Sequence, residues 1–162
     1  MVYTRSHHEI EKISRSCQIV ADTLIMIEKY IVDGACVSDL DKMAEEYIIS
    51  QGARPAFKGY MGFPATLCVS IEDAVVHGIP GKDILKQGQI VGIDCGAELD
   101  GYYGDHARSF AVGEISPNKK KLLDVTRESL LKGIKQAVPG NHVGDIGRAV
   151  QDHAENNGFS VV

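Results

Sequence analysis

The stretch "IVGIDCGAELDGYYGDHARSF", residues 90–110, consists of two β-prone runs separated by the pair Asp100-Gly101. An Asp-Gly pair between such runs is typical of a β-hairpin with a two-residue turn. We therefore predict two antiparallel strands, over residues 89–97 and 102–112.

Two aspartates, Asp94 in the first strand and Asp105 in the second, are predicted to share one face of this hairpin. A two-residue turn places Asp94 opposite Ala107, which is two residues from Asp105, so the two aspartate Cβ atoms would be about 7 Å apart. Burying a charge without a partner is costly. Converging carboxylates suit a hard or borderline cation, or two cations roughly 3.5–4 Å apart. The spacing alone leaves open that both carboxylates face solvent or cap nearby turns. His106 alternates to the opposite face, which disfavours it as a further ligand.

Helical patterns flank the hairpin. Ser6 and Glu9 have the spacing of a capping box, and apolar residues then recur at steps of three and four, which predicts a long helix with one buried face. The apolar positions of that face are Ile10, Ile13, Cys17, Val20, Leu24, Ile27 and Ile31. Further helices are predicted over residues 38–51, 117–138 and 143–156, and a strand over residues 66–71.

The two helical pairs share a pattern at a constant offset of 106 residues. The matching positions are Gly34, Val37, Asp39, Leu40, Lys42 and Gly52 with Gly140, Val143, Asp145, Ile146, Arg148 and Gly158. This predicts a duplicated αα-then-β unit, with a first repeat over about residues 6–112 and a partial second repeat over about 116–162. The final residues, "GFSVV", are typical of the start of a strand, so we expect an incomplete second half.

Composition narrows the class of protein. The chain has 162 residues, 44% of them hydrophobic, and a net charge of −5, which fits one globular domain or part of one and disfavours a nucleic-acid footprint. No stretch has the roughly 18 apolar residues of a membrane span, and the start has no signal-peptide core. The four cysteines form no CxxC pair, which disfavours a zinc site or a disulfide framework and favours a cytoplasmic location.

His77 lies at the end of a predicted strand, just before the breaker-rich turn "HGIPG". A lone histidine in that position is usually a surface or structural residue. Its functional interpretation is an imidazole that hydrogen-bonds a substrate or transfers a proton.

Several segments resemble type I methionine aminopeptidases: "EIEKISRSCQIVADTL" (9–24), "DLDKMAEEYI" (39–48), "GARPAFKGYMGFPATLCVSIEDAVVHGIPG" (52–81) and the hairpin. The resemblance covers nearly the whole chain. It implies an α+β, pita-bread (creatinase/aminopeptidase-like) fold. It also implies a metalloprotease that removes the N-terminal methionine from nascent proteins, using water activated by two divalent ions, which could be Co, Mn, Fe or Zn.

The resemblance also implies roles for individual residues. Asp94 and Asp105 match metal ligands, Asp105 the one that bridges both ions, and His77 matches a catalytic histidine that contacts the substrate. The positions that match the lining of the methionine pocket are Phe57, Tyr60, Phe63 and Cys68, which the residues alone would assign to a packed core. The sequence departs from the family pattern at Glu72, Ala74 and His106.

The family's remaining ligands, one histidine and two glutamates, are expected beyond Val162. Two aspartates hold a dinuclear centre poorly, so we expect weak or absent metal binding and no activity from these 162 residues alone. Two alternatives remain: a non-catalytic pita-bread binding protein, with the ribosome as a partner by analogy, or one half of an assembly in which a second chain completes the fold.

Overall fold

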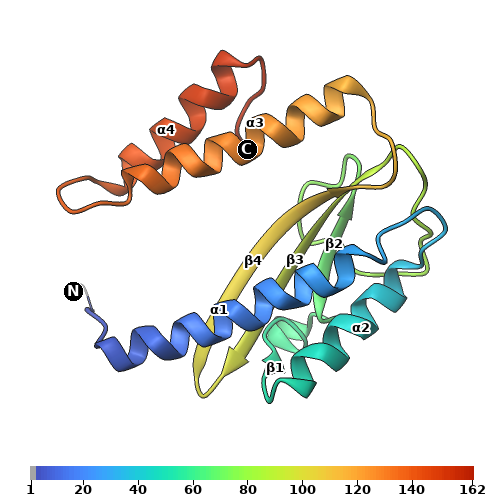
Figure 1. Ribbon diagram of the computed structural model, residues 1–162, viewed down its shortest axis with the longest axis horizontal. Coiled ribbons are helices and arrows are strands. Elements are labelled where there is room, and N and C mark those ends of the chain that lie inside the picture. The colour runs from blue at the N-terminus through green and yellow to red at the C-terminus, as the bar shows by residue number, and fades with distance from the viewer. Residues whose placement is uncertain (1–2) are drawn as a thin grey trace. The chain divides into compact units, whose positions relative to one another are not determined.

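The computed structural model describes residues 3–162, which divide into two compact units with the boundary between Ile115 and Ser116. The first unit contains two long helices and all the strands, and the second contains a pair of helices (Figure 1). The helices are α1 (His7–Glu28), α2 (Val37–Ser50), α3 (Pro117–Gln136) and α4 (Val143–Asn156), with a short 3-10 turn η1 (Tyr60–Gly62). The strands are β1 (Arg54–Pro55), β2 (Leu67–Ile71), β3 (Ile90–Leu99) and β4 (Tyr102–Ala111). No helix in the described part of the chain is long and apolar enough to span a membrane.

Strand β3 is the centre of the antiparallel sheet. It pairs with β4 along one edge and with β2 and β1 along the other. The β3–β4 pairing runs without a bulge from Ile90 opposite Ala111 to Leu99 opposite Tyr102, which confirms the predicted register. The turn residues Asp100 and Gly101 have φ values of 54° and 83°, the left-handed geometry that a two-residue hairpin turn requires.

Helices α1 and α2 cover one face of this sheet (Figure 1). The side chains of β3 alternate, so Ile93, Cys95 and Ala97 point into the helix-covered core and are fully buried. Asp94 and Gly96 belong to the opposite face. The alternation therefore gives the hairpin one apolar face for the core and one face on which polar groups can gather.

The buried face of α1 is partly different from the predicted one. The capping box forms as predicted, and Val20, Leu24 and Ile27 are buried, but Ile10 is 51% exposed and Cys17 is also exposed. Residues Ser16, Ile19 and Thr23 take their place in the interface. The cause lies in β4: a Cβ on Gly104 would come within 2.5 Å of backbone atoms of Ser16 and Cys17, so the helix backbone packs directly on the strand.

The second unit is a helix pair. Ser116 caps α3 by accepting a hydrogen bond from the Lys119 amide at 3.3 Å, and a proline follows at the first helical position, as the sequence predicts. Gly133 gives α4 room, because a Cβ there would lie 2.9 Å from Val150. Residues 159–162 form no strand. The sequence repeat between the two units stays a prediction.

Candidate metal centre

Asp94 and Asp105 lie side by side on the face of the hairpin opposite the helices. Asp105 pairs with Gly96, two residues from Asp94. Burial, followed by the hydrogen bond and the charge of Asp105, raises the pKa of Asp94 to about 6; the amide of Cys95 and the charge of His77 oppose this shift. The Oδ1 atom of Asp94 is buried and has no hydrogen-bond partner among the described residues.

These properties fit a bound cation. A carboxylate oxygen only accepts, and a buried acceptor without a partner beside a second carboxylate is unfavourable unless a positive charge is present. Oxygen ligands of this kind suit hard or borderline divalent ions. Within residues 3–162, no group of three or more His, Cys, Asp or Glu side chains is arranged to hold an ion. The carboxylate pair is therefore a partial ligand set.

Cys68 lies directly opposite Asp94 across the β2–β3 pairing and is only 7% exposed. Burial, with smaller contributions from the charges of Asp94 and Asp105, raises the pKa of its thiol to about 11. A metal ligand must be a thiolate. Without a bound ion, Cys68 is therefore a neutral, apolar wall beside the carboxylates at neutral pH.

Phe57 forms a second wall. Its ring lies over Gly96, where a Cβ would come within 2.5 Å of ring atom Cε1 and 3.0 Å of Cζ. Because Gly96 pairs with Asp105, the ring is on the same face as the two carboxylates. The structure thus brings Phe57 and Cys68, two of the four predicted pocket residues, next to Asp94 and Asp105.

The other two predicted pocket residues are held in a tight turn. The Phe63 amide donates to the Tyr60 carbonyl at 2.9 Å, and the Gly59 amide donates to the Phe63 carbonyl at 2.8 Å. Tyr60 is 70% exposed, whereas Phe63 is partly buried. The Tyr60 side chain is therefore largely in solvent, whereas Phe63 is partly covered.

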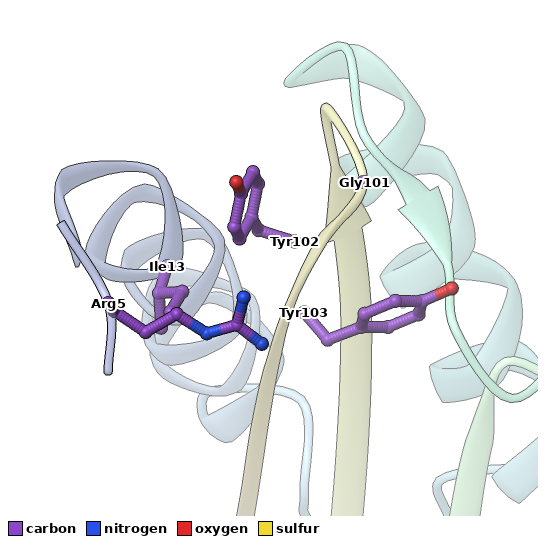
Figure 2. Close-up of a pocket in the computed structure, with 5 residues that line it drawn as sticks. All are labelled: Arg5, Ile13, Gly101, Tyr102 and Tyr103. Atoms are coloured by element: carbon purple, nitrogen blue, oxygen red, sulfur yellow. The ribbon is translucent and has the colours of Figure 1, made fainter. Parts of the chain in front are cut away.

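Two clefts in the surface lie elsewhere. One of about 380 Å³ is lined by Arg5, Ile13, Gly101, Tyr102 and Tyr103, at the hairpin turn and the start of α1 (Figure 2). The guanidinium of Arg5 is paired with Glu9 at 3.1 Å, so its charge is already compensated. A second cleft, of about 310 Å³, lies on α3 and α4. Neither cleft includes a predicted pocket residue.

His77 lies in the loop that follows β2 and is within electrostatic reach of Asp94. Its φ of 59° is in the left-handed region, which is uncommon for a residue with a side chain and is often found at functional sites. The next residue, Gly78, fixes the loop on β2, since its carbonyl accepts from the Val69 amide at 2.8 Å. A Cβ on Gly78 would come within 2.0 Å of the Val69 carbonyl oxygen.

His106 is not near this site. It pairs with Cys95 and so belongs to the helix-covered face, as the alternation predicts. On that face Arg108 reaches Glu28 of α1 with hydrogen bonds of 3.0 and 2.8 Å.

Sequence reasoning missed two residues that shape the site, Gly96 and Asp41. Gly96 makes room for the Phe57 ring, and Asp41 of α2 accepts hydrogen bonds from two amides at the start of β2. A glycine inside a β-run is a signal of close packing that could have pointed to Gly96. Asp41 has no comparable signal, because its partners are 25 and 26 residues away.

Comparison with known proteins gives the family and the fold. Residues 11–162 match the model of metallopeptidase family M24. The chain is 47% identical over 163 residues to a methionine aminopeptidase of Clostridium acetobutylicum, and 46% identical over 162 residues to methionine aminopeptidase 1 of Bacillus subtilis. Each alignment covers 100% of this chain and 65% of the relative.

The crystal structure of methionine aminopeptidase from Rickettsia prowazekii matches the fold with a TM-score of 0.98 at 37% identity, covering 100% of this chain and 65% of that chain. The match confirms the expected α+β pita-bread fold and the resemblance to methionine aminopeptidases. The chain spans about 65% of the length of these relatives.

Proposed function

Since the chain belongs to metallopeptidase family M24, we propose that it supplies the two-aspartate part of the metal centre of a metal-dependent aminopeptidase. The proposed reaction is removal of the N-terminal methionine from nascent proteins. Relatives at 47% and 46% identity bear the name methionine aminopeptidase, which supports this substrate class.

The observation that carries the proposal is the Asp94–Asp105 pair. Asp94 is partly buried beside the exposed Asp105, and Asp94 Oδ1 has no partner within residues 3–162. A bound divalent ion would offset the repulsion between the two carboxylates and would also give Asp94 Oδ1 a partner.

Each side chain has a distinct task in this scheme. Asp94 and Asp105 would hold the divalent ions, which when bound lower the pKa of water and polarise a peptide carbonyl. His77 would donate a hydrogen bond to the substrate near the scissile bond. Phe57 and Cys68 would contact the methionine side chain as apolar walls.

The remaining metal ligands would come from outside these 162 residues, either from further sequence or from a second chain. The identity of the ions, which could be Co, Mn, Fe or Zn, would follow metal availability. By analogy we also propose a cytoplasmic location and association with the ribosome, where nascent N-termini emerge.

Two assays test the proposal on this chain. The first measures Mn²⁺ binding by calorimetry, comparing the parent with Asp94→Asn and with Asp39→Asn, whose carboxylate is exposed on α2. We expect weak binding in the parent and in Asp39→Asn, and none in Asp94→Asn. Equal binding by all three chains would refute the metal site.

The second assay measures methionine release from a Met-Ala-Ser peptide with Mn²⁺ or Co²⁺. Release that requires Asp94 would mean that a second copy of the chain supplies the remaining ligands. No release, together with Asp94-dependent Mn²⁺ binding, is the result expected if those ligands lie in further sequence. No release and no Asp94-dependent binding would favour the non-catalytic binding protein.

A further inference from the structure

Two acidic residues one turn apart on α2 reach the two walls of the carboxylate site. Asp41 Oδ1 accepts hydrogen bonds from the amides of Thr66 at 3.0 Å and Leu67 at 2.7 Å, where β2 begins. Glu45 accepts both its hydrogen bonds from Lys58 Nζ, at 2.6 and 2.7 Å. Each acidic side chain thus forms a tie, that is, a hydrogen-bonded link between α2 and a segment that is distant in sequence.

Each tie is next to a residue of the site. Leu67 precedes Cys68, which lies opposite Asp94. Lys58 follows Phe57, whose ring lies against Gly96. The anchored backbone therefore belongs to the two walls that lie beside the carboxylates.

The tie through Asp41 is the stronger of the two. Its carboxylate is partly buried, and a charged acceptor makes shorter and stronger hydrogen bonds to backbone amides than a neutral one. Burial raises the pKa of Asp41, while the amides of Leu67 and Thr66 lower it, so the amides compensate part of the cost of the buried charge. The Glu45–Lys58 pair is more exposed and contributes less.

We propose that Asp41 and Glu45 are positioning residues, which hold Cys68 and Phe57 in place beside the Asp94–Asp105 pair. The inference rests on the proposed function, because these walls are the ones that would take the methionine side chain. Asp41 sets the position of the β2 wall, and Glu45 sets the position of the Phe57 wall through Lys58.

Alkylation of individual cysteines, followed by mass spectrometry, tests the role of Asp41 on this chain. Asp41→Ala is expected to speed Cys68 alkylation by about tenfold or more, because loss of a charged acceptor increases local opening by at least that factor. Cys95, fully buried on the other face of β3, should keep its rate. Asp41→Asn retains the Oδ1 acceptor without its charge, so its rate should lie between those of the parent and Asp41→Ala. The matched control is Glu46→Ala, an exposed acidic residue on the same helix.

The Glu45 tie is tested separately, so that the conclusion does not depend on the folding of the Asp41→Ala chain. In fluorophenylalanine-labelled protein, Glu45→Ala should shift the ¹⁹F resonance that Phe57→Leu removes. Glu46→Ala should leave that resonance in place.

Three results would overturn the proposal. Equal acceleration of Cys68 and Cys95 in Asp41→Ala would show a general stabilising role. An Asp41→Asn chain that labels like Asp41→Ala would exclude the amide contacts as the cause, and an unmoved Phe57 resonance in Glu45→Ala would remove the second tie. None of these readouts needs metal or activity, so a chain that binds no Mn²⁺ would refute the proposed function and leave this test intact.

Discussion

The ring of Phe57 occupies the space that a side chain on Gly96 would need. A Cβ at Gly96 would lie 2.5 Å from ring atom Cε1, 3.0 Å from Cζ and 3.1 Å from the Cβ of Ala56. Gly96 pairs with Asp105, so the missing side chain lets an aromatic ring lie beside the carboxylate pair.

Gly96→Ala should therefore destabilise the first unit and displace Phe57. An added methyl in a filled space typically costs about 1–3 kcal/mol. Urea unfolding of the parent and variant measures this loss as a lower transition midpoint.

Gly92→Ala is the control on the same strand. A Cβ at Gly92 would have its nearest contacts at 3.8 Å, which is ordinary van der Waals distance, so its midpoint should change little. Equal losses in the two variants would show that the cost comes from replacing glycine in a strand and not from the Phe57 ring.

The hairpin and its register could be predicted because the determinants are local. Asp100-Gly101 fixes a two-residue turn, and the turn alone sets Asp94 opposite Ala107 and near Asp105. The cap of α1 at Ser6 is equally local, since its partner Glu9 is three residues away. In each case the contact that determines the local structure lies within a few residues of the sequence motif that predicts it.

Other features depend on contacts that a linear pattern does not contain. The apolar spacing of α1 predicts Ile10 and Cys17 inside, but close packing on Gly104 turns Ser16 inward instead, where its hydroxyl donates to the Tyr102 carbonyl at 2.9 Å. The role of Asp41 likewise appears only when α2 lies beside β2. At these positions tertiary packing, and not helical periodicity, determines which side chains are buried and which groups they contact.

Gly104→Ala is expected to weaken the contact between α1 and β4. The added Cβ would lie 2.5 Å from backbone atoms of Ser16 and Cys17, which cannot rotate away as a side chain can. The loss of stability should lie at or above the upper end of the usual range of about 1–3 kcal/mol, and hydrogen exchange should show faster exchange in α1.

Gly147→Ala is the matched control for a glycine in open space. A Cβ there would meet no atom outside its own helix backbone within 4 Å, and the residue lies inside α4, so alanine should stabilise that helix by up to about 1 kcal/mol. Unchanged protection of α1 in Gly104→Ala would contradict direct packing of the helix backbone on β4.

Asp94→Asn should stabilise the metal-free chain. The substitution removes the charge of the partly buried Asp94 beside the like charge of the exposed Asp105, and keeps the shape of the side chain. In buffer with EDTA at pH 8, the free energy of unfolding should rise by roughly 1 kcal/mol after discounting for solvent screening. Mn²⁺ should raise the melting temperature of the parent and leave that of the variant unchanged.

Glu46→Gln, which removes an exposed carboxylate from the middle of α2, should resemble the parent with and without Mn²⁺. A loss of stability in Asp94→Asn under EDTA would contradict repulsion between the two carboxylates. It would mean that Asp94 makes a net favourable contact in the absence of metal.

Glu9 should make the stability of the first unit depend on pH in the acid range. The backbone amide and hydroxyl of Ser6 donate to its carboxylate at 2.8 and 2.9 Å, Arg5 lies 3.1 Å away, and these contacts lower the pKa of Glu9 from 4.5 to about 2. A lowered pKa in the folded state means that the contribution is fully present above about pH 4.5 and is lost as the pH falls toward 2. In Glu9→Gln this part of the pH dependence should disappear, so the melting temperature, followed by circular dichroism, should fall less steeply than in the parent.

Glu46→Gln, which removes an exposed carboxylate on α2, should keep the parent's profile. Parallel profiles for the parent and Glu9→Gln between pH 4.5 and 2 would show that the charge of Glu9 does not stabilise the cap of α1.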